Sequence, residues 1–328
     1  MEFALSEEQQ ELAATVRSLL AKRGDARAAT YDESLWQTLC EQIGVAALGI
    51  PEAYDGAGFS LFESLVALEE IGRSLAPSPL LSSLVTSEAL LAGADEDAKA
   101  RLLPRIAMGE VAAFAESADA ANVLDGDLAT VLVVATDDGL FEVDPEAAPE
   151  AAQRTWTPTM DQTIRLASVR VDTSAATKIA DDATAALARA RLVGATGVSA
   201  LAAGCAGRAL EMTVAYTKER VQFGRPIGSF QALKHRMADM LVEVEMSRSA
   251  SWAASYAVST RAEDAERLAH VAKSYCCDAL AHIAGETVQL HGGIAITWEH
   301  DAQLVFKRAH ALGQLYGAPH EHRALVPR

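Results

Sequence analysis

The sequence predicts a mainly α-helical protein with a small β domain between two helical regions. Half of its 328 residues are apolar and only 5% are aromatic, a composition that suits packed helices better than a β-sandwich or a disordered chain. Short alternating apolar runs, typical of strands, are confined to residues 111–175. We therefore predict an N-terminal helical domain (1–110), a small β domain (111–175) and a C-terminal helical bundle (176–328).

Two capping boxes mark helix starts in the N-terminal domain. Ser6 is followed three residues later by Gln9, and Ser60 by Glu63, so each serine and its partner can satisfy free backbone N–H groups in the first turn. Apolar residues then recur at helical spacing after each box. The helices expected in this domain cover residues 7–22, 36–43 and 60–76, with further helices within 78–109.

The β domain is predicted from runs of β-branched and apolar residues separated by Asp/Gly turns. Turns are expected at Asp125-Gly126 and at Asp137-Asp138-Gly139. The expected strands are Thr130–Val134, Leu140–Val143, Thr163–Leu166 and Val169–Asp172.

Long helices return after the β domain and form an antiparallel bundle. Ser229 is expected to cap the second of them, and Gly292-Gly293 to end the third in a left-handed conformation. The predicted helices span about residues 180–220, 231–260, 262–290 and 301–314.

Charge and cysteine content exclude several kinds of protein. The formal net charge of −17 argues against nucleic acid or an anionic membrane surface as partner. The four cysteines lack metal-site spacing, so no metal is expected. The N-terminus has no cationic segment followed by an apolar core, and Ala185–Gly204 is interrupted by arginines. We therefore expect a cytoplasmic protein without a membrane span.

One segment has the opposite charge to the rest of the chain. Residues 208–236 contain six cations and two acids, and a Gly-flanked turn lies at Gln222–Gly228. Arginine and lysine side chains beside such a turn can hold an anion such as a pyrophosphate.

Two motifs within this architecture carry a family resemblance. They are ERVQFGRPIGSFQALKHRMADM, from Glu219, and QLHGGIAITWEHD, from Gln289. With the order of helical, β and helical domains, they make the chain resemble the acyl-CoA dehydrogenase flavoproteins over nearly its whole length. Within that family it is similar to the short subunits of actinobacterial hetero-oligomeric enzymes that act on steroid or other bulky acyl-CoA thioesters.

The resemblance implies FAD as cofactor, shared across a subunit interface. An arginine fork, amide donors and glycines that allow close backbone approach suit its pyrophosphate. Taken alone, the arginine could lie on an ordinary solvated helix face, and the glycines could only end a helix. The residues implied to bind FAD are Arg220, Gln222, Phe223, Gln231, Gln289, Gly292 and Gly293.

The sequence departs from the family where a carboxylate base is expected. The familiar base follows the last long helix in a Tyr-Glu-Gly-Thr sequence, and here that segment reads Tyr316-Gly317-Ala318-Pro319. The other familiar position, counted back from Arg220, is Gly194. Glycine cannot abstract a proton, so no catalytic residue is assigned.

The flavin-ring side departs as well. The family's Thr-Glu-Pro and Gly-Ser-Asp segment is replaced by Phe114–Ala120, in which Glu116 and Asp119 are possible remnants. The strand carrying the family's tryptophan is missing, because Trp156 comes too late in the domain. The β domain is therefore shortened.

These departures favour a subunit of a hetero-oligomeric acyl-CoA dehydrogenase, of α2β2 type. A second subunit of the same family would supply the ring site and the catalytic glutamate, and electrons would pass to an electron-transfer flavoprotein. One alternative is a homodimer whose base has an unrecognised position; another is a non-catalytic scaffold without FAD. The Gly/Ala-rich helix around Gly194 also suggests room for a bulky acyl group.

Overall fold

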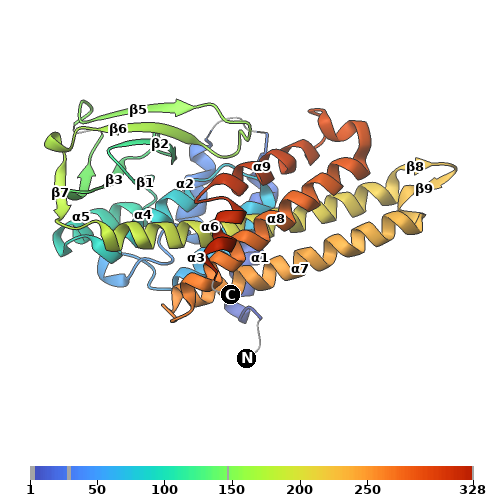
Figure 1. The fold of residues 1–328 in the computed structure, drawn as a ribbon, viewed down its shortest axis with the longest axis horizontal. Coiled ribbons are helices and arrows are strands. Elements are labelled where there is room, and N and C mark those ends of the chain that lie inside the picture. Colours follow the sequence, from blue (N-terminus) through green and yellow to red (C-terminus); the bar gives the residue numbers. More distant parts are fainter. Residues whose placement is uncertain (1–3, 28–30, 146–147, 327–328) are drawn as a thin grey trace.

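A computed structural model describes residues 4–27, 31–145 and 148–326 of the chain. It confirms the predicted fold class: a helical domain, a small β domain and a C-terminal helical bundle follow one another (Figure 1). The N-terminal domain contains α1 (Glu7–Arg23), α2 (Glu33–Ile43), η1 (Glu52–Tyr54), α3 (Leu61–Ser74), α4 (Leu80–Gly93) and α5 (Glu96–Ala107).

Both predicted capping boxes are present at the starts of α1 and α3. Helix α2 begins three residues earlier than predicted, because the Asp32 side chain accepts a hydrogen bond of 3.0 Å from the Leu35 backbone nitrogen and caps the first turn. Side chains from these helices share one apolar core with the C-terminal bundle and with the inner face of one sheet.

The β domain consists of two small sheets. One has the strand order β1-β3-β4-β7 and the other β2-β6-β5; β1 and β3 are parallel, and the remaining pairs in both sheets are antiparallel. A second apolar cluster, drawn from both sheets, fills the space between them. The strands are β1 (Ala112–Ala115), β2 (Asp119–Leu124), β3 (Val131–Thr136), β4 (Gly139–Val143), β5 (Ala152–Thr157), β6 (Leu166–Val171) and β7 (Thr177–Ala180).

Several strand predictions need correction. Strands β1, β2, β5 and β7 were not predicted, and β7 lies beyond the predicted end of the domain at residue 175. The strand predicted at Thr163–Leu166 is wrong except for its last residue. Asp161 accepts a 2.9 Å hydrogen bond from the Thr163 backbone nitrogen and pairs with Arg308 at 2.8 Å, which holds this segment in a turn.

The C-terminal bundle begins at α6 and ends close to the C-terminus. Its elements are α6 (Thr184–Glu219), β8 (Val221–Gln222), β9 (Arg225–Pro226), η3 (Ile227–Ser229), α7 (Gln231–Ser259), α8 (Ala265–His291), η4 (Gly292–Ile296), α9 (Ala302–Gln314) and α10 (Pro319–Leu325).

Two predictions about helix ends in the bundle are wrong in detail. Ser229 does not cap α7; it lies in η3, its hydroxyl donates to the Pro226 carbonyl at 2.7 Å, and Phe230 takes the cap position. Gly292 does end α8, but with φ 65° and ψ −145° rather than in the left-handed helical region.

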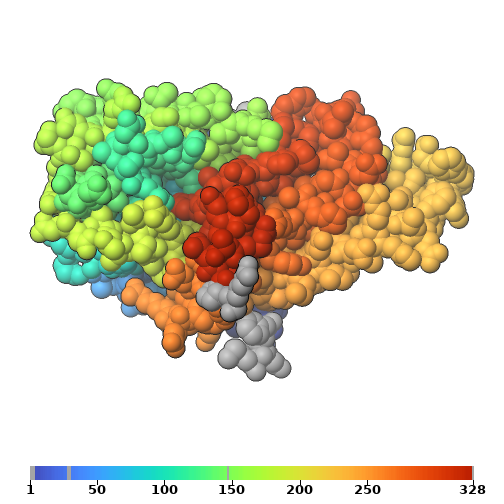
Figure 2. All heavy atoms as spheres, in the orientation of Figure 1, coloured from blue at the N-terminus to red at the C-terminus, as the bar shows by residue number. Residues whose placement is uncertain are grey.

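Helix α6 is the central element of the molecule. It is long and apolar enough to cross a membrane, but 89% of its most apolar window is buried inside the protein, as expected of a core helix. The β domain and α10 lie along its first half, whereas the hairpin β8–β9 projects beyond the bundle at its other end (Figures 1 and 2).

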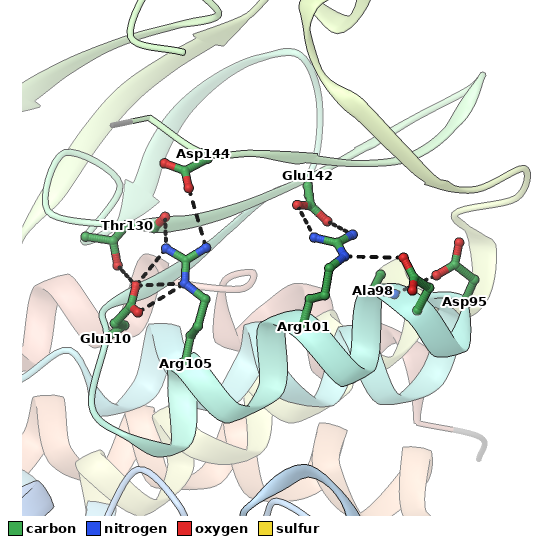
Figure 3. A network of polar contacts seen from close by, with 9 residues as sticks. Asp95, Ala98, Arg101, Arg105, Glu110, Thr130, Glu142 and Asp144 are labelled. Atoms are coloured by element: carbon green, nitrogen blue, oxygen red, sulfur yellow. Dashed lines mark hydrogen bonds and ion pairs between the residues drawn. The ribbon is translucent and has the colours of Figure 1, made fainter. Parts of the chain in front are cut away.

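Arginine side chains of α5 link the N-terminal domain to the β domain through ion pairs (Figure 3). Arg101 donates a bidentate pair of hydrogen bonds to the Glu142 carboxylate of β4, at 2.7 and 2.8 Å. Arg105 pairs with Glu110 at 2.8 Å and with Asp144 at 3.6 Å. Because the guanidinium and carboxylate groups are planar, these paired contacts also fix the orientation of α5 against the sheet.

Candidate functional site

The predicted phosphate-binding residues Arg220, Gln222 and Phe223 lie on or beside the β8–β9 hairpin. Phe223 and Gly224 both have positive φ, 53° and 76°, which closes the hairpin in two residues. A left-handed conformation is unfavourable for phenylalanine and costs about 1–2 kcal/mol. Its ring is nevertheless 91% exposed, and it lies edge-on to the Phe230 ring, at 6.1 Å between centroids.

The cations around this hairpin are largely free. In the described part of the chain, the exposed side chains of Arg220, Lys218 and Lys234 take part in no ion pair or hydrogen bond. Arg225 stacks on Phe230, with its guanidinium carbon 4.0 Å from the ring centroid. Free guanidinium and ammonium groups on an exposed hairpin are available to phosphate oxygens.

Gln222 and Gln231 are both exposed. The Gln222 amide donates to the neighbouring Val221 carbonyl at 2.8 Å, so it must give up this local bond to meet a phosphate. Gln231 is the first residue of α7, where free backbone N–H groups of the first turn add a favourable field for an anion.

The second motif lies at the same end of the bundle. Gln289, Gly292 and Gly293 are exposed where α8 ends, and a Cβ atom added at either glycine meets no atom within 4 Å. The ring of Tyr216, in the last turn of α6, stacks on His291 at 4.4 Å, and its hydroxyl donates to the His291 carbonyl at 3.3 Å. The two motifs are therefore tied together near one open backbone surface.

His291 adds an unusual polar group beside these glycines. Its Nδ1 lies 2.7 Å from the Thr287 carbonyl, which can only accept, so Nδ1 carries the proton. Burial lowers the pKa of His291, so Nε2 is an acceptor, and it is buried without a partner in the described residues. An N–H or O–H donor from a bound molecule or water could satisfy it.

The first expected base position, Gly194, is sealed by Tyr316. A Cβ atom added at Gly194 would lie 2.4–2.5 Å from three carbons of the Tyr316 ring, far inside van der Waals contact. The Tyr316 ring fills the space directly over Gly194, but a cavity lies beside it, lined by Leu192, Ala195 and Tyr316.

The second expected base position, Gly317, is held by polar contacts on both sides. The buried Lys273 ammonium donates to its carbonyl at 2.8 Å and to the Leu312 carbonyl at 3.2 Å. His322 Nε2 donates to the Tyr316 carbonyl at 2.7 Å. With φ 98° and a built Cβ 2.9 Å from His322 Nε2, position 317 accepts no side chain without strain.

The possible ring-side remnants are engaged elsewhere. Glu116 pairs with Arg191 at 2.7 Å, and Asp119 pairs with Arg170 at 3.0 Å. Trp156 lies on β5, where Arg165 stacks over it at 5.3 Å from the ring centroid. Among the described residues, the hairpin cations are thus free to meet phosphate oxygens, whereas Glu116 and Asp119 are paired with arginines and positions 194 and 317 hold glycine.

Comparisons with known proteins agree with this architecture. Residues 6–110 match the acyl-CoA dehydrogenase N-terminal domain, and residues 181–326 match the acyl-CoA dehydrogenase C-terminal domain. The chain is 41% identical over 325 residues to acyl-CoA dehydrogenase IpdE2 of Mycolicibacterium smegmatis, covering 97% of each protein. It is 44% identical over 323 residues to IpdE2 of Mycobacterium tuberculosis, covering 96% of this chain and 95% of that protein.

The chain belongs to the acyl-CoA dehydrogenase family. Members of this family are FAD-dependent oxidoreductases. Two solved structures resemble this acyl-CoA dehydrogenase along its length. The ChsE4–ChsE5 complex of Mycobacterium tuberculosis aligns with a TM-score of 0.90 and 22% identity, covering 99% of this chain and 97% of that one. The Tcur3481–Tcur3483 steroid enzyme aligns with a TM-score of 0.84 and 28% identity, covering 98% and 96%.

Sequence reasoning located the two glycines but missed the residues that cover them. Tyr316, Lys273 and His322 were not assigned any role. Tyr316 directly precedes Gly317, and α6 is rich in alanine and glycine around Gly194. These small residues indicate that another segment packs closely against α6. Which side chain packs there depends on the fold.

Proposed function

We propose that this acyl-CoA dehydrogenase acts as one subunit of a hetero-oligomer, of α2β2 type. The observation that carries the proposal is the packing at Gly194 and Gly317, the two positions where the family has its base. Gly194 lies under the Tyr316 ring, and Gly317 is fixed through its carbonyl by Lys273. A carboxylate must then come from another chain, because neither position here has room for one.

In this proposal the chain supplies the phosphate arm of the FAD site. Arg220 pairs with the pyrophosphate, Gln222 and Gln231 donate amide hydrogens, and Phe223 forms an apolar wall. Gln289, with Gly292 and Gly293, forms the second contact. Bound FAD would accept the hydride in α,β-dehydrogenation of a CoA thioester, and an electron-transfer flavoprotein would receive the electrons.

The exposed apolar surface supports a partner at this end of the bundle. Large hydrophobic side chains stand in solvent on the hairpin, on α7, and on the segment from η4 to the loop before α9. An apolar surface of this kind is unusual on a monomer and typical of a subunit contact. The residues are Val221, Phe223, Leu241, Val242, Met246, Ile296 and Trp298.

The similar structures suggest both the partner and the substrate class. The Tcur3481–Tcur3483 enzyme is a steroid acyl-CoA dehydrogenase of two named chains, and ChsE4–ChsE5 is likewise a complex. By analogy, we propose a second acyl-CoA dehydrogenase subunit as partner, and a steroid side-chain or other bulky acyl-CoA as substrate.

Purification of the chain with and without a co-expressed partner tests the proposal. The chain alone should be colourless and inactive with acyl-CoA, whereas the complex should contain both subunits in equal number and hold FAD. Native mass spectrometry and flavin absorbance measure both quantities. One FAD per chain and unaided acyl-CoA oxidation by the isolated protein would contradict the proposal and favour a homodimer.

A further inference from the structure

Helix α10 is held against α8 mainly by polar side chains. Figure 1 shows it in dark red beside α8, just before the C-terminus. Of its seven residues only His322 is buried, and Leu325 is largely exposed. Arg323 pairs with Asp278 of α8, but both side chains are about half exposed, and ion pairs of this kind contribute little to stability. The attachment of α10 therefore depends chiefly on His322.

Both ring nitrogens of His322 make a contact. Nε2 lies 2.7 Å from the Tyr316 carbonyl, which can only accept, so Nε2 carries a proton. Nδ1 lies 2.8 Å from Nδ1 of His270, in α8. Because Nδ1 of a neutral His322 is an acceptor, His270 donates the proton between the two rings. The docked position of α10 thus fits a neutral His322 and leaves no open nitrogen for another proton.

The titratable side chains that face His322 come from α8 and from α10 itself. On α8 they are His270 and Lys273, and Lys273 is fully buried and donates to two backbone carbonyls nearby. On α10 the facing acid is Glu321. Glu266 lies behind His270, 3.7 Å from its Nε2 atom. Burial lowers the pKa of His322 most strongly, its hydrogen bond to a carbonyl opposes this, and Lys273 and His270 lower the pKa further.

The geometry lets α8 and α10 share one extra proton but not two. A first proton is accommodated at His270 Nε2, which faces the exposed Glu266 carboxylate. A second proton would belong to His322 Nδ1, where it would meet the proton of His270 Nδ1 across 2.8 Å. Once released from α8, His322 is open to water and takes this proton below its ordinary pKa of about 6.5. The released state thus binds more protons than the docked state, and acid shifts the equilibrium toward release.

We propose that α10 is released from α8 at acidic pH, with His322 as the group whose protonation releases it. The neutral imidazole holds α10 in place near neutral pH. Below about pH 6.5, each further unit favours the released state by up to about tenfold. A helix of seven residues is too short to persist alone in water, so release also unfolds it. Glu321, His322 and Leu325 line the cavity beside Tyr316, so release removes one wall of that cavity.

Hydrogen exchange of the full-length chain, followed by mass spectrometry at pH 7.5 and pH 5.0, tests the proposal. Exchange rates are first corrected for the pH dependence of the unfolded backbone. The protection of the α10 amides should then be up to about thirtyfold lower at pH 5.0. The amides of the buried helix α6 should keep their protection at both pH values, which distinguishes release of α10 from acid unfolding of the whole chain.

Three substitutions identify the titrating group. His322→Gln removes the group that takes the proton, so the protection of α10 should be the same at both pH values. His320→Gln, on an exposed histidine of the same helix, is the matched control and should lose protection as the wild type does. His270→Gln keeps His322 but replaces the fixed donor with an amide that can also accept, so the loss of protection at pH 5.0 should shrink.

The variant His270→Gln decides the matter if His322→Gln already releases α10 at pH 7.5. The proposal is overturned if wild-type α10 is equally protected at both pH values, or if His270→Gln loses as much protection on acidification as the wild type. The measurement needs neither FAD nor a partner, so its result is independent of the proposed function.

Discussion

The two ends of helix α6 have opposite surroundings. In the first half, Gly194 is buried under the Tyr316 ring, and no side chain fits there. At the far end, Arg220 and Phe223 stand in solvent on a projecting hairpin. The first half of α6 is therefore packed within this chain. At its other end, Arg220 is exposed and makes no ion pair among the described residues.

The contrast indicates which part of the family's chemistry this chain retains. A carboxylate base needs room for its side chain, and at Gly194 and Gly317 a built Cβ would meet Tyr316 and His322. Phosphate recognition needs free donors on an accessible surface, and the hairpin keeps them. Substitutions in the packed half should therefore change stability, while substitutions on the hairpin should change cofactor retention alone.

The largest stability effect is expected at Asp125, in the packed region between α4 and β2. Burial raises the pKa of its carboxyl to about 7. Ser82 has one hydroxyl proton and two neighbours, the Pro79 carbonyl at 2.9 Å and the Asp125 carboxyl at 2.7 Å. A protonated Asp125 that donates to the Ser82 hydroxyl satisfies all three groups.

Because the folded pKa lies above the ordinary value, the folded protein binds this proton more tightly than the unfolded chain. This group's contribution to stability is thus present at acidic pH and is lost as pH rises toward 7. Asp125→Asn, whose amide can donate to Ser82, should be near neutral at pH 4 and stabilising by up to about 4 kcal/mol at pH 8. Urea unfolding across this pH range measures it; an equal effect at both ends would contradict the account.

Gly194→Ala tests the packed half directly. The new Cβ overlaps the Tyr316 ring, so we expect a loss of about 3 kcal/mol in the free energy of unfolding. Gly285→Ala is the matched control, since it lies within α8 and an added Cβ meets nothing within 4 Å. That change should stabilise by about 0.5–1 kcal/mol. Equal effects of both substitutions would show that Gly194 is not sealed.

Lys273→Met should have an intermediate effect. The lysine is fully buried and holds the carbonyls of Leu312 and Gly317. Removing the ammonium deprives the half-buried Gly317 carbonyl of this donor and leaves the Leu312 carbonyl to the weaker Cys277 thiol at 3.6 Å. We expect a cost of about 2 kcal/mol. Lys22→Met, on an exposed position of α1, should cost less than about 0.5 kcal/mol. Thermal unfolding of both variants makes the comparison.

The fold could be predicted from sequence where local signals agree. Helices with capping boxes, such as those after Ser6 and Ser60, begin where predicted. The residues that make up the sequence pattern are the ones that form the hydrogen bonds of the first turn. The long bundle helices were also predicted close to their observed bounds. Strand β1 was missed because Ala112–Ala115 is buried on both faces and carries no alternation.

The site could be predicted only in part, for a related reason. Arg220 and the two glycines belong to continuous motifs, so the sequence shows them together. The sealing of Gly194 depends on Tyr316, which lies 122 residues later in the chain (316 − 194). Contacts at that separation follow from helix packing, and a residue count cannot give them. The same holds for Asp161 and Arg308, whose buried pair replaced a predicted strand with a turn.

Arg220→Ala should have the smallest effect on the free energy of unfolding and a large effect on FAD binding. Its side chain is exposed and unpaired in the described part of the chain, so unfolding should change by less than about 0.5 kcal/mol. In the complex with its partner, removing the guanidinium fork should weaken FAD binding about ten- to a hundredfold. The control is Arg267→Ala, an exposed arginine at the start of α8.

FAD retained per complex is therefore the most direct test of the central claim. Wild-type and Arg267→Ala complexes, gel-filtered at equal protein concentration, should keep their flavin, while the Arg220→Ala complex should lose it and remain assembled. If the Arg220→Ala complex keeps full flavin occupancy, this chain does not hold the cofactor phosphates, and the account of its exposed end is wrong.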